Sequence, residues 1–181
     1  MRIERTSADP KAYIDEFANI SMQTRKIFRN PQGELENVQL RNIIMTVVMA
    51  VAAVWSFWFY STINNGIILV LSGMLLGLLV PYIKTIVSVS KYKKNIDLND
   101  GYYEVTEEGV SHTTERASLK IFWPAIRAVR VYKHSIVLIP VDAKTAFLVI
   151  PAERKDDLLG FMNEHGIDKP LIESHKYGKD E

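Results

Sequence analysis

The chain has 181 residues, of which 48% are hydrophobic and 24% charged, and its formal net charge is +1. A length and composition of this kind fit one ordinary domain with an extension. The near-neutral charge provides no electrostatic footprint for a nucleic-acid partner. The sequence has no cysteine, which excludes disulfides and thiolate sites and agrees with a cytoplasmic location for the polar parts.

Residues 1–41 form a polar N-terminal segment with one predicted amphipathic helix. Asp9 is expected to cap this helix, with Pro10 at the first helical position, and the helix should end near Asn30. Residues at steps of three and four form one stripe on its surface: Tyr13, Phe17, Ile20, Thr24 and Ile27. We expect the stripe to dock on the C-terminal domain of the same chain; binding to a membrane surface or to a partner is the alternative.

A long apolar run follows the polar segment. Residues 42–83 contain no Asp, Glu, Lys, Arg or His, and these 42 residues are about twice the length of a membrane-spanning helix. The polar stretch 61–66 divides the run, and its Asn-Asn-Gly sequence is typical of a tight turn. The sequence therefore predicts a transmembrane hairpin over 42–89. A helix pair buried in a soluble bundle would instead carry charged residues on one face of each helix.

Cations flank the predicted hairpin on both sides and are absent from its turn. By the positive-inside rule both termini of this two-pass chain are expected on the cytoplasmic side of the membrane. The four cations before the first pass are Arg25, Lys26, Arg29 and Arg41. The four at the end of the second pass are expected to contact the membrane surface: Lys84, Lys91, Lys93 and Lys94.

A motif of small residues in the second pass, Ser72, Gly73 and Gly77, allows helix backbones to approach closely. It would pack the second pass on the first, or one copy of the chain on another. The first alternative is favoured because a short hairpin already places a partner helix beside it. A pore built from several copies could be lined by Thr46, Ser56 and Ser72, although such hydroxyls commonly bond to their own helix backbone.

After the Lys-rich segment the pattern changes to short strands separated by turns, which predict a cytoplasmic α+β domain over 99–168. The expected strands are 102–106, 110–114, 118–123, 125–132, 135–140 and 145–151. A last helix over about 153–165 should end at Gly166. The predicted fold is a small antiparallel sheet or open barrel closed by this C-terminal helix, followed by a flexible tail over 169–181.

Two of these strands are apolar at nearly every position. Residues 136–139 and 147–150 lack the alternation of a strand with one wet face, so both of their faces require cover. The C-terminal helix can cover one face. The other face is left for the N-terminal helix, the far wall of a small barrel, or another protein.

The order of short motifs in this region resembles the YcxB-like family of bacterial membrane proteins. A strand ends in Thr106, Gly109 and Val110, a second leads to Trp123 and Ile126, and a third ends in Ile150 and Pro151. Members of that family also place two membrane passes before this domain. The resemblance implies a pleckstrin-homology-like fold without enzymatic activity, in a multi-pass protein of a bacterial plasma (inner) membrane. Many relatives have basic residues and an aromatic after the Ile-Pro pair, whereas this chain has Ala-Glu-Arg-Lys-Asp-Asp, which argues against an anion site there.

The domain core is expected to include Trp123, Ile126, Ile150 and Phe161. No chemical motif accompanies it. The four histidines lack the spacing of metal ligands, and the adjacent Asp156 and Asp157 diverge on a helix instead of sharing a site. We therefore expect no enzyme, no metal and no cofactor.

The predicted function is that of a membrane-anchored binding or assembly module. Its partners would be the lipid bilayer and a second copy or an unidentified membrane or cytoplasmic protein. The alternative is a small multimeric pore or an accessory subunit of a transporter, although the hairpin has no ionisable residue between 42 and 83.

Overall fold

The computed structural model describes residues 1–63, 66–96 and 101–173. They belong to two compact units, one formed by Met1–Leu35 with Ile96–Glu181 and the other by Glu36–Asn95. The helical hairpin and the α+β domain predicted from the sequence are both confirmed. The residues of the expected turn at Asn64 and Asn65 lie outside the described ranges.

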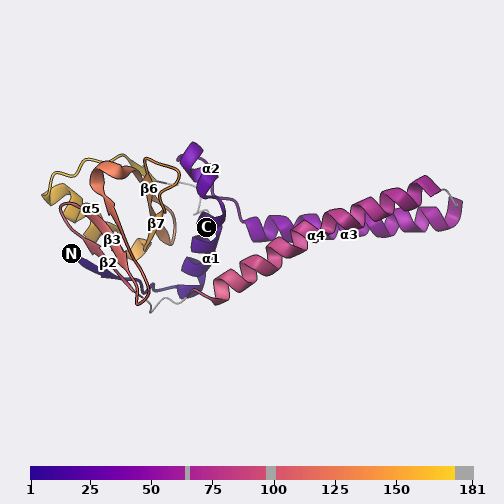
Figure 1. The fold of residues 1–181 in the computed structure, drawn as a ribbon, viewed down its shortest axis with the longest axis horizontal. Coiled ribbons are helices and arrows are strands. Elements are labelled where there is room, and N and C mark those ends of the chain that lie inside the picture. The colour runs from indigo at the N-terminus through magenta and orange to yellow at the C-terminus, as the bar shows by residue number, and fades with distance from the viewer. Residues whose placement is uncertain (64–65, 97–100, 174–181) are drawn as a thin grey trace, which may run out of the picture. The chain divides into compact units, whose positions relative to one another are not determined.

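The second unit is a hairpin of two long helices, α3 (Val38–Ile63) and α4 (Gly66–Lys94), which pack side by side along their length (Figure 1). Asn37 caps the start of α3, because its side-chain Oδ1 accepts from the Leu40 N–H at 2.9 Å. With 26 and 29 residues, the helices are about 39 and 44 Å long and exceed the roughly 30 Å thickness of a hydrocarbon core.

In the first unit the predicted N-terminal helix is present but interrupted. It consists of α1 (Pro10–Met22) and α2 (Thr24–Arg29), and the expectation of one continuous helix was wrong at Gln23. There the backbone turns to φ −112° and ψ 16°, and the Gln23 N–H bonds back to the Ile20 carbonyl. Asp9 caps α1 as predicted, accepting from the Ala12 N–H at 3.0 Å.

The described strands of this unit form two four-stranded sheets. The first sheet has the order β1-β2-β3-β4 and is antiparallel throughout. Its strands are β1 (Arg2–Glu4), β2 (Tyr102–Val105), β3 (Gly109–Thr113) and β4 (Ser118–Phe122). Strand β1 was not predicted; it joins the N-terminal residues to a sheet made by residues about 100 positions later.

The second sheet has the order β7-β6-β5-β8. Its strands are β5 (Ile126–Val131), β6 (Ser135–Pro140), β7 (Leu148–Pro151) and β8 (Leu171–Glu173). β8 runs parallel to β5 and lies in the segment predicted as a flexible tail, so that prediction was wrong for residues 171–173. The six predicted strands pair with one another only in antiparallel fashion, so the parallel pair is made by a strand that was not predicted. The rest of that tail lies outside the described residues.

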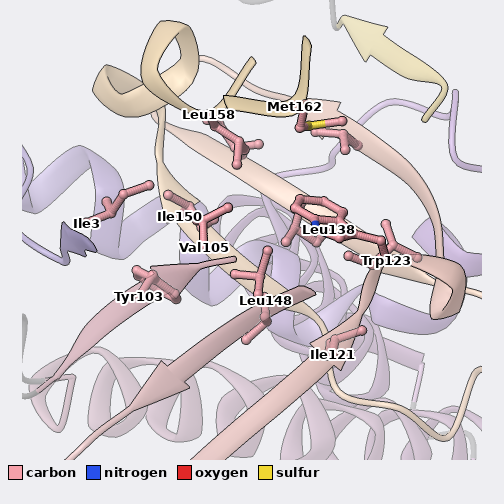
Figure 2. Packing of buried hydrophobic residues seen from close by; sticks show 14 residues of the cluster. Ile3, Tyr103, Val105, Ile121, Trp123, Leu138, Leu148, Ile150, Leu158 and Met162 are labelled. Carbon is pink, nitrogen blue, oxygen red and sulfur yellow. The ribbon is translucent and has the colours of Figure 1, made fainter. Parts of the chain in front are cut away.

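The main core lies between the two sheets and is closed by α5 (Lys155–Glu164), which follows a short 3₁₀ turn at Ala152–Arg154. Figure 2 shows Leu158 and Met162 of α5 directed at this core, together with Trp123, Leu138 and Ile150. Ile126 is buried in the same cluster, and Phe161 packs against it partly buried. The predicted helix-closed sheet architecture therefore surrounds one continuous apolar cluster.

The motif residues Thr106, Gly109 and Trp123 come together where β2 turns into β3. The Trp123 indole Nε1 donates to the Thr106 carbonyl at 2.9 Å, and the Thr106 hydroxyl donates to the Gly109 carbonyl at 3.1 Å. A Cβ on Gly109 would lie 2.2 Å from the Ile121 carbonyl oxygen of β4, so only glycine fits here. These contacts fix the β2–β3 turn against the 3₁₀ turn Trp123–Ala125, which follows β4.

Candidate functional sites: an exposed apolar hairpin and a helix-covered sheet

The hairpin leaves most of its large apolar side chains exposed. Val54, Trp55 and Met74 are 69%, 65% and 62% exposed, and each candidate span has only 6% of its most apolar window buried. The candidate spans are Val38–Tyr60 and Val70–Lys94, both long and apolar enough to cross a membrane. Exposed apolar surface of this extent requires cover by a membrane or by another protein.

The small-residue motif in α4 divides between two sides of the helix. Ser72 is buried in the seam between α3 and α4, whereas Gly73 and Gly77 are exposed. A Cβ built on either glycine meets nothing within 4 Å, so neither glycine permits a close approach of α3. The favoured alternative, packing of one pass on the other through these glycines, is therefore not what the structure has. Packing between copies stays a prediction.

Two of the hydroxyl groups that could line a pore donate hydrogen bonds within their own helices. Thr46 Oγ1 donates to the Asn42 carbonyl and Ser72 Oγ to the Ile68 carbonyl, both at 2.8 Å. These are the i to i−4 bonds expected of Ser and Thr in apolar helices. Two of the three residues proposed to line a pore therefore have an intrahelical partner.

The polar ends of the hairpin carry the cations predicted to contact a membrane surface. Lys93 Nζ donates to Gln39 Oε1 at 2.5 Å and so ties the end of α4 to the start of α3. Lys84, Lys91 and Lys94 are exposed on α4. Arg41 forms an ion pair with Glu36 at 2.5 Å, with both side chains about half exposed.

The second functional candidate is the interface between the second sheet and the N-terminal arm, which we define as residues 5–35. A separate apolar cluster fills this interface. The arm contributes Tyr13, Ile20, Ile27 and Leu35, and the sheet contributes Val137, Ile139 and Val149 with the adjacent Tyr132. The predicted docking of the N-terminal stripe on the domain is confirmed. It covers the second face of the apolar strands, opposite the face that packs on the main core.

Two tyrosine hydroxyls from distant parts of the chain meet on one carbonyl at this interface. Tyr13 Oη of α1 and Tyr103 Oη of β2 donate to the Val149 oxygen at 2.8 and 2.6 Å. Burial is the main reason that the pKa of each tyrosine is raised above its ordinary value, so both hydroxyls stay protonated donors. The contact joins the arm, the first sheet and strand β7.

Glu16 of α1 anchors the arm to the turn between β5 and β6. Glu16 is 7% exposed, and its carboxylate accepts from the His134 N–H at 2.8 Å. Burial raises the pKa of Glu16, and the nearby Ser135 hydroxyl and turn N–H groups only partly offset this. The carboxylate thus supplies a needed acceptor at a cost in desolvation.

Glu153 binds the start of the arm. In this contact the domain supplies the carboxylate and the arm supplies the donors. Glu153 Oε1 accepts from Ser7 Oγ at 2.7 Å and from the Ala8 N–H at 2.9 Å. Partial burial acts to raise the pKa of Glu153, but these hydrogen bonds outweigh it and the pKa is lowered overall. The two carboxylates therefore hold the α1 region from both partners.

Two arginines of β5 hold the end of the arm. Arg127 Nη1 donates to the Phe28 carbonyl at 3.3 Å, and Arg130 Nη1 donates to the Pro31 carbonyl. Arg130 is 1% exposed, and its guanidinium lies 4.4 Å from the ring centre of Tyr132. Burial lowers its pKa. Arg127 bonds a carbonyl in the last turn of α2, where a helix favours cations, and Arg130 bonds a carbonyl in the segment just after the helix.

The polar character of this interface distinguishes it from the main core. Among the described residues of the unit, each buried polar or charged side chain belongs to the arm or contacts it: Arg5, Glu16, Gln23, Arg130 and Ser135. The main core cluster is formed by hydrophobic residues. Sequence reasoning found the apolar stripe but missed Glu16, Arg130 and Glu153, because their partners lie about 100 residues or more away.

The described histidines occupy structural positions. His112 stacks on Tyr103 with ring centres 4.6 Å apart, and His165 stacks on Phe161 at 4.1 Å. Within the ranges that the structure covers, no three His, Asp or Glu side chains gather as a metal site requires. His175 lies outside those ranges.

Comparison of the chain with family models, with curated proteins and with solved structures yields no match in any of the three.

Proposed function

We propose that the chain is a membrane-anchored binding or assembly module, in which the hairpin holds the protein in a bilayer and the α+β unit binds a partner without catalysis. The exposed apolar surface of α3 and α4 carries this proposal. In water, exposure of this surface would oppose solubility, whereas a bilayer covers it without any further contact.

We further propose that the chain lies in the plasma (inner) membrane of a bacterium with both termini in the cytoplasm. Cations before α3 and at the end of α4, and their absence between, support this orientation. We further propose a YcxB-like protein whose domain is pleckstrin-homology-like. The order of the elements supports this proposal. The hydrogen bonds that join the motif residues Thr106, Gly109 and Trp123 also support it.

Membrane anchoring is tested by alkaline extraction and vesicle flotation of the full chain. The chain is expected to remain with the lipid after carbonate washing, since two apolar helices bury their exposed side chains there. Recovery in the soluble fraction would contradict the proposal. Co-purification after mild detergent extraction, read by mass spectrometry, then identifies the partner.

Solute flux in vesicles that contain the pure protein distinguishes a pore or transport accessory from a binding module. We expect no flux above that of empty vesicles, because Thr46 and Ser72 already donate to their own helix backbones. Robust flux from the pure protein would overturn the binding proposal.

A further inference from the structure

Lys84 directly follows the uncharged run 42–83 and lies ten residues before the end of α4. Six uncharged residues separate it from Lys91, so it lies about 10 Å nearer the hairpin turn along the helix. The helix is continuous from Gly66 to Lys94, so no break in it reverses the direction of the chain. The flanking Val80, Ile83 and Val87 are about half exposed. Lys84 is therefore a cation with exposed apolar side chains on either side of it along the helix.

The packing of α3 on α4 gives the depth of Lys84 within the hairpin. The bond between Lys93 and Gln39 sets the register at one end, and the buried Asn42 and Val89 lie close to the same level. Lys84 precedes Val89 by five residues, which places it about 7 Å farther toward the turn. At that level α3 also exposes apolar side chains, Ile44, Val47 and Val48. Lys84 thus has exposed apolar side chains near its level on both helices.

Lys84 belongs to a polar stripe on the outward face of α4. Lys84, Ser88 and Lys91 follow at i, i+4 and i+7, the spacing that places residues on one face of a helix. All three are exposed. The residues that face α3, Ser72 and Val89, lie more than about 100° away around the helix axis. The stripe therefore faces the surroundings of the hairpin.

The counter-charge for this stripe has to come from outside the hairpin. The sequence has no Asp or Glu from residue 37 to residue 96, so neither the hairpin nor the hairpin of a second copy supplies a carboxylate. An ammonium group in hydrocarbon is costly without a partner, and a lysine chain can extend several Å to reach the headgroup layer. The anion present in that layer at high concentration is the phosphate of a phospholipid.

We propose that Lys84, Ser88 and Lys91 form a binding site for the phosphate group of a phospholipid in the leaflet at the polar ends of the hairpin. Lys84 reaches the phosphate from the hydrocarbon side and Lys91 from the water side, with the Ser88 hydroxyl between them. Two cations facing one headgroup favour an anionic phospholipid over a zwitterionic one. The site rests on the proposed membrane location.

The test uses the full chain in vesicles of phosphatidylcholine and phosphatidylglycerol, followed by native mass spectrometry of the retained lipid. Lys84→Gln is expected to lower retained phosphatidylglycerol about fivefold, the effect of roughly one interfacial cation. Lys84→Arg should retain it. Lys94→Gln removes the same charge outside the stripe and serves as the matched control, with a smaller loss expected. Phosphorus dephasing of the Lys84 ammonium signal in solid-state NMR would report the contact directly.

Vesicle flotation separates failure of this site from failure of the membrane location. If the wild-type chain does not float, the proposed function is wrong. If the chain floats but Lys84→Gln retains as much phosphatidylglycerol as the wild type, the phosphate site is wrong. Equal losses from Lys84→Gln and Lys94→Gln would indicate a diffuse surface charge and would also overturn it. Cross-linking of residue 84 to an acidic membrane protein, with lipid retention unchanged, would do the same.

Discussion

The Val149 carbonyl accepts from two tyrosine hydroxyls, and this sharing predicts a non-additive loss of stability. Tyr13→Phe or Tyr103→Phe alone removes one donor and leaves the other, so each should lower the free energy of unfolding by about 0.5 to 1.5 kcal/mol. The double variant removes both donors from a buried acceptor, and its loss should exceed the sum by roughly 1 kcal/mol. Urea unfolding of the four proteins in detergent measures this cycle.

Additive losses would contradict that account, because they would mean that each hydroxyl acts independently of the other. Phe keeps the ring in both positions, so the comparison isolates the hydroxyl groups from the packing of Tyr13 in the arm cluster and of Tyr103 in the main core.

A second residue-scale prediction concerns the buried carboxyl of Glu16. Because burial raises its folded pKa, its contribution to stability is fully present below its unfolded pKa, near 4.5, and is lost as pH rises through the folded pKa. Glu16→Gln keeps an acceptor for the His134 N–H but does not titrate. The variant should gain free energy of unfolding relative to the wild type in that window, by at most about 1.4 kcal/mol per pH unit.

The measurement is the difference in unfolding free energy between wild type and Glu16→Gln from pH 5 to pH 8. Glu153, the carboxylate of the domain that accepts from the arm, has a lowered pKa and stays ionised throughout that range. Its own contribution would be lost only as pH falls below the range. A constant difference across pH 5 to 8 would show that Glu16 does not titrate there.

At the scale of elements, the docking of the arm makes its buried stripe a determinant of domain stability. Ile20 is fully buried against the second sheet, so Ile20→Asp should lower the free energy of unfolding by about 3 kcal/mol or more through an unpaired buried charge. Met22 on the same helix is 38% exposed, and Met22→Asp is the matched control with an expected change within about 0.5 kcal/mol. Thermal unfolding of the full chain in detergent compares them.

The alternative is that the apolar stripe of α1 and α2 binds a membrane surface. It predicts an unchanged melting temperature for Ile20→Asp, together with a loss of affinity of an α1–α2 peptide for anionic vesicles. Docking predicts the opposite pattern, since the stripe is then already covered by Val137, Ile139 and Val149.

Elements with a strong local pattern could be predicted from the sequence. The uncharged run 42–83 indicated the hairpin, the Asp-Pro pair marked the start of α1, and the unbroken apolar strands required cover on both faces. β1 and β8 have three residues each, too few for a periodic pattern, and their pairing depends on partners far along the chain. The break at Gln23 also lacks a Gly or Pro signal.

The two candidate sites could be predicted from the sequence to different degrees, because only one of them depends on a pattern within a single segment. The exposure of the hairpin follows from composition alone, and so does the list of cations around it. The polar contacts of the arm join Glu16 to His134 and Ser7 to Glu153, separated by 118 and 146 residues. No pattern within one segment specifies such a pair. The outward direction of Gly73 and Gly77 likewise depends on which face of α4 meets α3.

At the scale of the whole molecule, the distribution of cations predicts the orientation of the chain in the membrane. Because the sequence has no cysteine, single substitutions report without background. Asn65→Cys lies between the two passes, and Arg116→Cys lies in the exposed turn between β3 and β4. With a membrane-impermeant maleimide on intact cells, we expect labelling of the first and not of the second.

Permeabilised cells provide the control, since both cysteines should then react. The physical reason for the expected pattern is that translocating either cation group, the one before α3 or the one at the end of α4, is disfavoured, whereas the turn between the helices carries no charge to retain it. Labelling of Arg116→Cys alone on intact cells would show the opposite orientation, with the domain outside the cell. Labelling of both on intact cells would place the turn and the domain on the same side, and the two helices would then not span the bilayer.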